Sequence, residues 1–303
     1  MAAMRRWLEF VAAWTVLHAL GFLPRPLARA AGAGIARTAF WARGSLRRTA
    51  HVNLALAFPA WTEGQRRAAI KKMVRNIGWM AGEFSQFPKY TRDNIEKIVL
   101  LDGFENFDAA QRRGRGVLFV TGHTGAWELA PYAHALYGHP LHFLVRPLDN
   151  ARVDALINSY RSLSGNSPIE KNRAARAMLG LLRCGETVGV LIDQNTSREE
   201  GVFVNFFGVP ACTTTGLARI ALRTNAAVVP GFLFWDEHLR KYRLRFESEI
   251  PLVRSGDEER DIRENTALFT QAVEEYIRRH PDQWLRVHKR WKTRPAGEPP
   301  MYR

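Results

Sequence analysis

Cysteine is scarce in this chain, and several familiar catalytic patterns are missing from it. The 303 residues include only two cysteines, Cys184 and Cys212, which lie far apart and match no metal-binding spacing. Such sparing use of cysteine indicates a reduced, cytosolic environment. There is no GxSxG elbow and neither cysteine has a histidine nearby, so a covalent nucleophile from the protein is not indicated. The zinc patterns HExxH and HxxEH are absent too, which predicts a site without a metal.

Acidic residues are also in deficit. Against 44 Lys and Arg there are 29 Asp and Glu, which gives a formal net charge of +15 and favours polyanionic partners such as nucleic acid, an anionic membrane surface or a phosphorylated substrate. The basic residues are spread along the chain without a recognition-helix, zinc or aromatic RNA-binding signature, so nucleic acid is not expected. With 46% hydrophobic residues, the chain can bury a sizeable core.

The N-terminus carries the one apolar run that approaches the thickness of a bilayer. Residues 7–24 read WLEFVAAWTVLHALGFLP and would extend about 27 Å as a helix. Because Glu9, Thr15 and His18 interrupt the run, a cleaved signal peptide, an interfacial helix and a buried core helix remain alternatives. More arginines follow the run than precede it, which would keep the rest of the chain cytoplasmic. We therefore predict a membrane-anchoring helix in residues 1–30.

Residues 31–98 form a basic region with helical spacing. Thr62 is followed by apolar residues at a period near 3.6, which predicts a helix with its start near that residue. The basic face of this region could lie against anionic lipid headgroups or could simply be solvated, and both interpretations stay open.

Strands and helices alternate through the remaining residues, 99–303. Predicted strands lie at 116–122, 141–147, 187–193, 227–235 and 241–250, with a strand or hairpin at 202–208. Predicted helices lie at 126–136, 150–165, 173–185 and 215–226. This alternation predicts an α/β fold in which a mixed, largely parallel sheet is covered by helices, and residues 99–303 would form the catalytic part.

The segment GHTGAWE, residues 122–128, contains a candidate catalytic pair. On one continuous helix, five residues would turn Glu128 roughly 140° away from His123, so the histidine must precede the helix. With a strand that ends near Gly122 and a helix that starts near Thr124, His123 lies at the carboxyl end of a strand, where open α/β sheets bind ligands. We predict that His123 is a general base and that Glu128 reaches back to one ring nitrogen while the other nitrogen faces the substrate.

Six stretches resemble a known family. GHTGAWE resembles the His-x4-Asp/Glu motif of the glycerolipid acyltransferase superfamily. Five further segments resemble, in the same order, its branch of late lipid A acyltransferases: VRPLDN (145–150), NSYRSLSGN (158–166), VGVLIDQN (188–195), GVFVNFFGVPACTTTGLARIA (201–221) and QWLRVHKRWKTRP (283–295). The resemblance covers most of the chain and implies a glycerolipid-acyltransferase-like fold.

The resemblance also implies a reaction and a place in the cell. A fatty acyl chain would pass from an acyl carrier protein thioester, or from coenzyme A, to a hydroxyl of a Kdo-modified lipid A precursor, which is an anionic glycolipid. No cofactor would be needed because the thioester is already activated. The protein would work among membrane lipids on the cytoplasmic face of a bacterial inner membrane.

Individual residues follow from the same resemblance. His123 would be the general base and Glu128 its partner. Arg161 matches a functional arginine that would bind a substrate phosphate or stabilise charge on the thioester oxygen. Asp193 matches a functional acid that would orient Arg161 or another basic group. Apart from the resemblance, Arg146 comes at the end of a predicted strand, where it could contact phosphate or be a simple strand-end charge.

Other readings of the same residues stay open. The acceptor could be a lysophospholipid, another glycolipid or an amino-acid lipid. The protein could also be a non-catalytic, basic lipid-binding protein at the membrane surface. Residues 288–292, which read HKRWK, could contact lipid headgroups or the acidic carrier protein.

Overall fold

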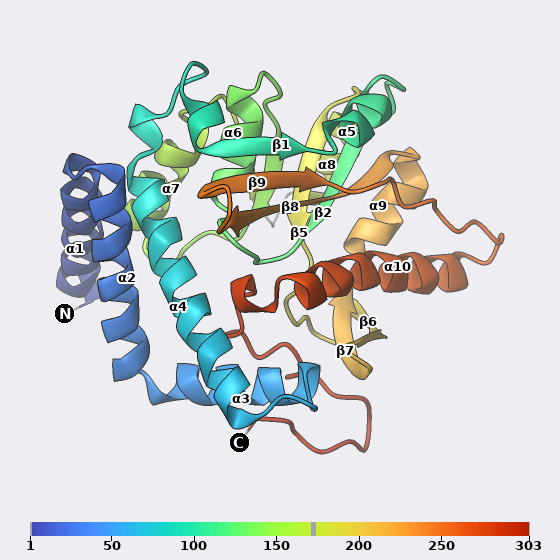
Figure 1. Ribbon diagram of the computed structural model, residues 1–303. Helices are drawn as coiled ribbons and strands as arrows, with labels where there is room; N and C mark the ends of the chain where they lie inside the picture. Colours follow the sequence, from blue (N-terminus) through green and yellow to red (C-terminus); the bar gives the residue numbers. More distant parts are fainter. Residues whose placement is uncertain (1, 171–173, 303) are drawn as a thin grey trace.

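The computed structural model describes residues 2–170 and 174–302 (Figure 1). Its helices are α1 Ala2–Phe22, α2 Arg25–Ala42, α3 Gly44–Ala57, α4 Glu63–Ser85, α5 Phe104–Gln111, α6 Leu129–Leu136, α7 Ala151–Ser162, α8 Ala174–Arg183, α9 Gly216–Thr224 and α10 Glu258–Arg279. Its strands are β1 Val99–Asp102, β2 Val117–Thr121, β3 His142–Val145, β4 Ser167–Glu170, β5 Thr187–Leu191, β6 Gly201–Phe206, β7 Val209–Thr214, β8 Ala227–Asp236 and β9 Lys241–Phe246. The first residue of the predicted helix 173–185 lies outside the described residues.

Seven strands form one sheet in the order β1-β9-β8-β2-β5-β3-β4. Every neighbouring pair is parallel except β8 with β9, which are joined by a tight turn and run antiparallel. The predicted mixed, largely parallel sheet is therefore confirmed. The segment predicted as a strand or hairpin at 202–208 is a hairpin, in which β6 pairs with β7 apart from the main sheet.

Helices cover both faces of the sheet. Successive side chains along each strand point to opposite faces, so each strand contributes to two cores. On one face, Leu118 and Val120 of β2 pack in a core with residues of α8, α9 and α10. On the other face, Phe119 of β2 and Phe143 of β3 pack in a second core with residues of α4, α5, α6 and α7. The site described below opens on this second face.

The N-terminal helices form a layer beside this sheet, with α1, α2 and α4 side by side (Figure 1). As predicted, α4 begins just after Thr62, whose hydroxyl accepts from the backbone N–H of Gln65 in a capping box. Further along α4, the fully buried Glu83 carboxylate accepts from the Arg25 guanidinium of α2 at 2.7–3.1 Å and from the Tyr90 hydroxyl. This buried ion pair ties α2 to α4.

The predicted membrane anchor is not supported. Within residues 2–170 and 174–302, no helix combines the length and the apolar character needed to cross a membrane. The apolar run predicted at 7–24 lies in α1, where Glu9, Thr15 and His18 interrupt it, and the predicted boundary after residue 30 falls inside α2.

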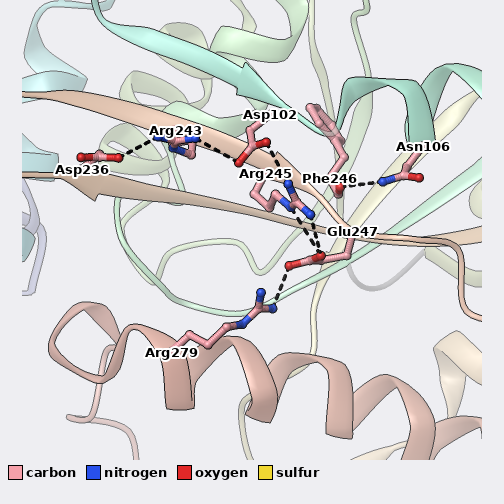
Figure 2. A network of polar contacts seen from close by, with 8 residues as sticks. All are labelled: Asp102, Asn106, Asp236, Arg243, Arg245, Phe246, Glu247 and Arg279. Atoms are coloured by element: carbon pink, nitrogen blue, oxygen red, sulfur yellow. Dashed lines mark hydrogen bonds and ion pairs between the residues drawn. The ribbon is translucent and has the colours of Figure 1, made fainter. Parts of the chain in front are cut away.

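A charged network fastens β9, whose last residue lines the site, to its neighbours (Figure 2). Asp102 at the end of β1 accepts from Arg245 at 2.8 Å and from Arg243 at 3.4 Å. Glu247, just after β9, accepts from Arg245 and also from Arg279 of α10 at 2.7 Å. The network therefore links β1, β9 and α10. It holds β9, whose last residue Phe246 lines the cavity, in place.

Candidate active site

The register of two central strands brings His123 and Asp193 together. β2 and β5 are parallel neighbours in which Thr121 stands opposite Leu191. The ladder continues one step, because the backbone N–H of Ile192 donates to the Thr121 carbonyl at 3.0 Å. His123 and Asp193 each lie two residues beyond their strand, so they meet at the same edge of the sheet.

The imidazole of His123 is held in one orientation. Its Nδ1 lies 2.7 Å from Asp193 Oδ1, and its backbone N–H donates to Asp193 Oδ2 at 3.0 Å. Since the carboxylate can only accept, Nδ1 carries the proton, and in the neutral ring Nε2 keeps its lone pair. That lone pair lies 3.2 Å from the side-chain nitrogen of Gln194, an exposed residue whose amide can donate to it. A substrate hydroxyl could take the place of this amide at Nε2.

Asp193 is buried and accepts three hydrogen bonds. Besides His123, it accepts from the indole N–H of the buried Trp284 at 3.2 Å. Burial raises the pKa of Asp193, but the His123 charge, the His123 hydrogen bonds and the more distant Arg290 outweigh it and bring the pKa below its usual range. Asp193 is therefore a carboxylate at neutral pH.

The same contacts make His123 a stronger base than a free imidazole. Burial lowers the pKa of His123, but the charge and hydrogen bond of Asp193, with a smaller contribution from Glu128, raise the pKa above its ordinary value. The His123 side chain is 20% exposed, so Nε2 can be reached while the Nδ1 side is enclosed.

Two glycines allow the loop after β2 to adopt this shape. A Cβ at Gly125, whose φ is +57°, would lie 1.9 Å from the Leu233 carbonyl oxygen. A Cβ at Gly122 would lie 3.3 Å from the Asp193 carboxyl carbon. The His123 carbonyl accepts from the backbone N–H of Leu285 at 2.8 Å, which fixes the loop against the C-terminal segment.

Glu128 does not contact His123 in the way that its spacing predicts. The residues after His123 form a turn, and α6 begins only at Leu129 instead of near Thr124. The Glu128 carboxylate instead accepts from Arg161 of α7 in a bidentate pair, at 2.8 Å and 2.5 Å. The partners predicted from the sequence are thus exchanged: Asp193 orients His123, and Glu128 orients Arg161.

A cavity of about 210 Å³ extends from this cluster into the second face of the sheet. His123, Glu128, Arg146 and Arg161 line its polar end. The rest of its wall is mostly apolar and includes Phe119, Leu141, Phe143, Gly189, Leu191, Gly231, Leu233, Leu244 and Phe246. The arrangement places a base and cations at the mouth of a space that suits a hydrocarbon chain.

One ionisable group lies inside this apolar wall. The ring of His134, on α6, lines the cavity, and neither of its nitrogens has a hydrogen-bond partner among the described residues. Burial lowers the pKa of His134 to about 3, so the ring is neutral at physiological pH. The inner part of the cavity therefore carries no charge from this residue.

Comparison with known proteins decides the family. The family model described as "Bacterial lipid A biosynthesis acyltransferase" matches residues 1–293. The chain belongs to this family. It is therefore an acyltransferase, and its site residues can be considered as parts of an acyl-transfer site.

Curated relatives of this acyltransferase match along most of their length. It is 28% identical over 301 residues to the lipid A biosynthesis lauroyltransferase of Escherichia coli, a match that covers 98% of this chain and 94% of the relative. It is 26% identical over 252 residues to a lipid A biosynthesis acyltransferase of Haemophilus influenzae, covering 83% and 77%. The lipid A biosynthesis myristoyltransferase of Escherichia coli is 24% identical over 259 residues, covering 86% and 79%.

The structure leaves Arg146 of the acyltransferase accessible for its predicted contact, but it buries part of the predicted contact segment 288–292. Arg146, just after β3, is exposed at the mouth of the cavity, where the sequence places a phosphate contact. In the segment 288–292, Lys289 and Lys292 are exposed, but Arg290 and Trp291 are buried. Arg290 donates to the backbone carbonyls of Gln194 and Cys212, so this part of the C-terminal segment packs against the β6–β7 hairpin. The whole segment therefore cannot serve as a surface contact.

Three residues of the site were not identified as functional from the sequence. Trp284 lies in the segment 283–295, which resembles the family, but its contact with Asp193 depends on the fold. Gln194 follows Asp193 directly, which was the available signal for a group beside the histidine. Thr124 follows His123 directly and lines the cavity, and its buried hydroxyl has no hydrogen-bond partner within residues 2–170 and 174–302.

Proposed function

We propose that the protein transfers a fatty acyl chain from an acyl carrier protein thioester to a hydroxyl of a Kdo-modified lipid A precursor. The observation that carries the proposal is the His123–Asp193 pair at the mouth of a mostly apolar cavity. The family and the names of the relatives supply the acceptor class. The carrier protein, the Kdo modification and the absence of a cofactor come from the motif resemblance and are parts of the proposal.

The proposed chemistry begins with His123. Its Nε2 takes the proton of the acceptor hydroxyl while the oxygen attacks the thioester carbonyl carbon. Asp193 accepts from Nδ1–H and stabilises the imidazolium that forms. The tetrahedral intermediate then expels the thiolate, which takes the proton back from Nε2. One C–O bond forms, one C–S bond breaks, and the products are an ester and a thiol.

Charge that develops on the thioester oxygen needs donors in the cavity mouth. We assign this role to the unpaired hydroxyl of Thr124 and to the Arg161 guanidinium, because both residues line the cavity. Glu128 holds Arg161 in place through the bidentate pair. The exposed Arg146 is proposed to bind a phosphate of the acceptor.

The acyltransferase is proposed to work at the cytoplasmic face of a bacterial inner membrane. Its acceptor would reside in that bilayer, and its net charge of +15 would favour both anionic lipid and an acidic carrier protein. Exposed apolar side chains on α1, among them Trp7, Leu8 and Trp14, supply a surface that could lie on the membrane.

Product mass tests the proposal. Purified protein in detergent receives a mixed pool of acyl carrier protein thioesters and, in separate reactions, a Kdo-modified lipid A precursor, a lysophospholipid, a glycolipid and an amino-acid lipid. The proposal expects the first acceptor to gain the mass of one acyl group. Transfer only to another acceptor, in a mixture where a known lipid A acyltransferase is active, would contradict the proposed acceptor.

The depth of the cavity should set the length of the donor acyl chain that the enzyme prefers. Gly189 of β5 lies opposite Phe119 and beside Phe143, and a Cβ there would make only ordinary contacts at 3.8–3.9 Å. In Gly189→Val, the added methyl groups would occupy the part of the cavity that we assign to the donor acyl chain. We expect the preferred donor to become about two carbons shorter, and the relative kcat/KM for the original chain to fall about tenfold.

A competition assay with mixed-length donors and mass analysis of the product measures this preference. The matched control is Gly180→Val on α8, where a Cβ meets nothing within 4 Å and the cavity is not touched. An unchanged chain preference in a folded Gly189→Val protein would show that the chain does not occupy this cavity.

A further inference from the structure

A second apolar groove meets the active site at Glu128. It has a volume of about 470 Å³ and lies between α1, α4 and α7. Its walls come from α1, α4 and α7: Ala12, Ala13, Val16, Leu17, Leu20, Met80, Ala81, Phe84 and Ile157. Glu128 is the one charged residue in its wall, and Glu128 also lines the cavity below His123.

The shape of the groove comes from small side chains. Ala12 and Ala13 on α1 and Ala81 on α4 leave space where larger residues would close the gap between the two helices. Helix α1 contacts both α4 and α7, and the buried Glu83–Arg25 pair fixes α2 against α4. The groove therefore lies between helices whose positions are fixed by these contacts. Helices α1, α2 and α4 lie side by side in one layer beside the sheet (Figure 1).

The two spaces differ in the way that two lipid substrates differ. The cavity lined by His123 extends along the second face of the sheet. It suits the one acyl chain that is attached to the thioester carbon. The groove shares Glu128 with that cavity, and its other lining residues come from α1, α4 and α7. Val16, an exposed apolar side chain of α1, lines the groove.

We propose that this groove binds an acyl chain already present on the acceptor lipid. The proposal rests on the proposed function, since it assigns a place to the second substrate of the same reaction. A glycolipid whose phosphate lies at Arg146 and whose sugar lies beside Glu128 would have its hydroxyl near His123 Nε2. One of its chains would then follow α1 between that helix and α4, and this contact would select acylated acceptors and fix which hydroxyl reacts.

Filling the groove tests this assignment. Ala81 is exposed on α4, so Ala81→Phe should fold while its ring occupies the groove. We expect the KM for the acylated disaccharide acceptor in detergent micelles to rise at least about tenfold, the effect of losing roughly two buried methylenes. The KM for the thioester donor should stay within about twofold. The matched control is Ala68→Phe, an exposed alanine on the same helix away from the groove.

Each outcome bears on the assignment. With an acceptor whose chains are shortened, the difference between Ala81→Phe and the unaltered protein should shrink, and that would support the groove as a chain site. A raised KM for the donor alone would place the donor chain there and overturn it. Weaker binding to anionic vesicles with an unchanged acceptor KM in micelles would mean that the groove holds bilayer lipid, and would overturn it too.

Failure of the groove and failure of the proposed function can be told apart. If the unaltered protein acylates the disaccharide lipid and Ala81→Phe matches it in every constant, only the groove assignment is wrong. If the unaltered protein transfers no acyl group to that lipid, the proposed function itself is wrong.

Discussion

His123→Ala should lower kcat for acyl transfer at least about a hundredfold. The substitution removes Nε2, and with it the proposed proton acceptor for the attacking hydroxyl. The rate of product formation, measured by mass with both substrates saturating, shows this directly. Thioester binding should change little, because the apolar wall of the cavity is intact.

The matched control is His238→Ala, which replaces an exposed histidine in the turn between β8 and β9, away from the cavity. It should leave kcat unchanged. A folded His123→Ala protein with the same kcat as the unaltered one would eliminate His123 as the base and would favour a lipid-binding role for the site.

Asp193→Asn should lower kcat by about 10²- to 10⁴-fold. An asparagine amide can donate to Nδ1, which would place the ring proton on Nε2 and remove the lone pair that must accept the hydroxyl proton. Glu128→Gln leaves the His123–Asp193 pair in place and only weakens the contact with Arg161, so its loss should be smaller. Steady-state rates of the two variants, with their melting temperatures as a folding control, test this order. A larger loss in Glu128→Gln would restore Glu128 as the partner of the histidine.

Much of the fold and part of the site could be predicted from the sequence. The strand ends at Gly122 and near Ile192 are marked by apolar runs, so the position of His123 and Asp193 at the carboxyl edge followed from local pattern. That β2 and β5 are neighbours did not follow, because strand order is a tertiary property that no local spacing encodes. Without it, Asp193 was assigned to Arg161 or another basic group instead of to His123.

The spacing argument for Glu128 was wrong for a local reason. It assumed that a helix begins directly after His123, whereas Gly125 adopts φ +57° and the chain turns before α6. That turn points Glu128 toward α7. No prediction was made for α10, although Asp257 caps its N-terminus and Ile262, Phe269 and Val273 recur on one buried face.

The most direct test of the central claim is the titration of His123 itself. In protein labelled with ¹³C-histidine, the His123 resonance is assigned by its loss in His123→Gln and followed by NMR against pH. The account predicts a pKa above the ordinary value of about 6.5 in the unaltered protein. A general base must be neutral to act, so activity should rise with pH through that same value. The pKa should fall clearly in Asp193→Asn and only slightly in Glu128→Gln. A pKa unchanged in Asp193→Asn and lowered mainly in Glu128→Gln would contradict the claim that Asp193 orients the catalytic histidine.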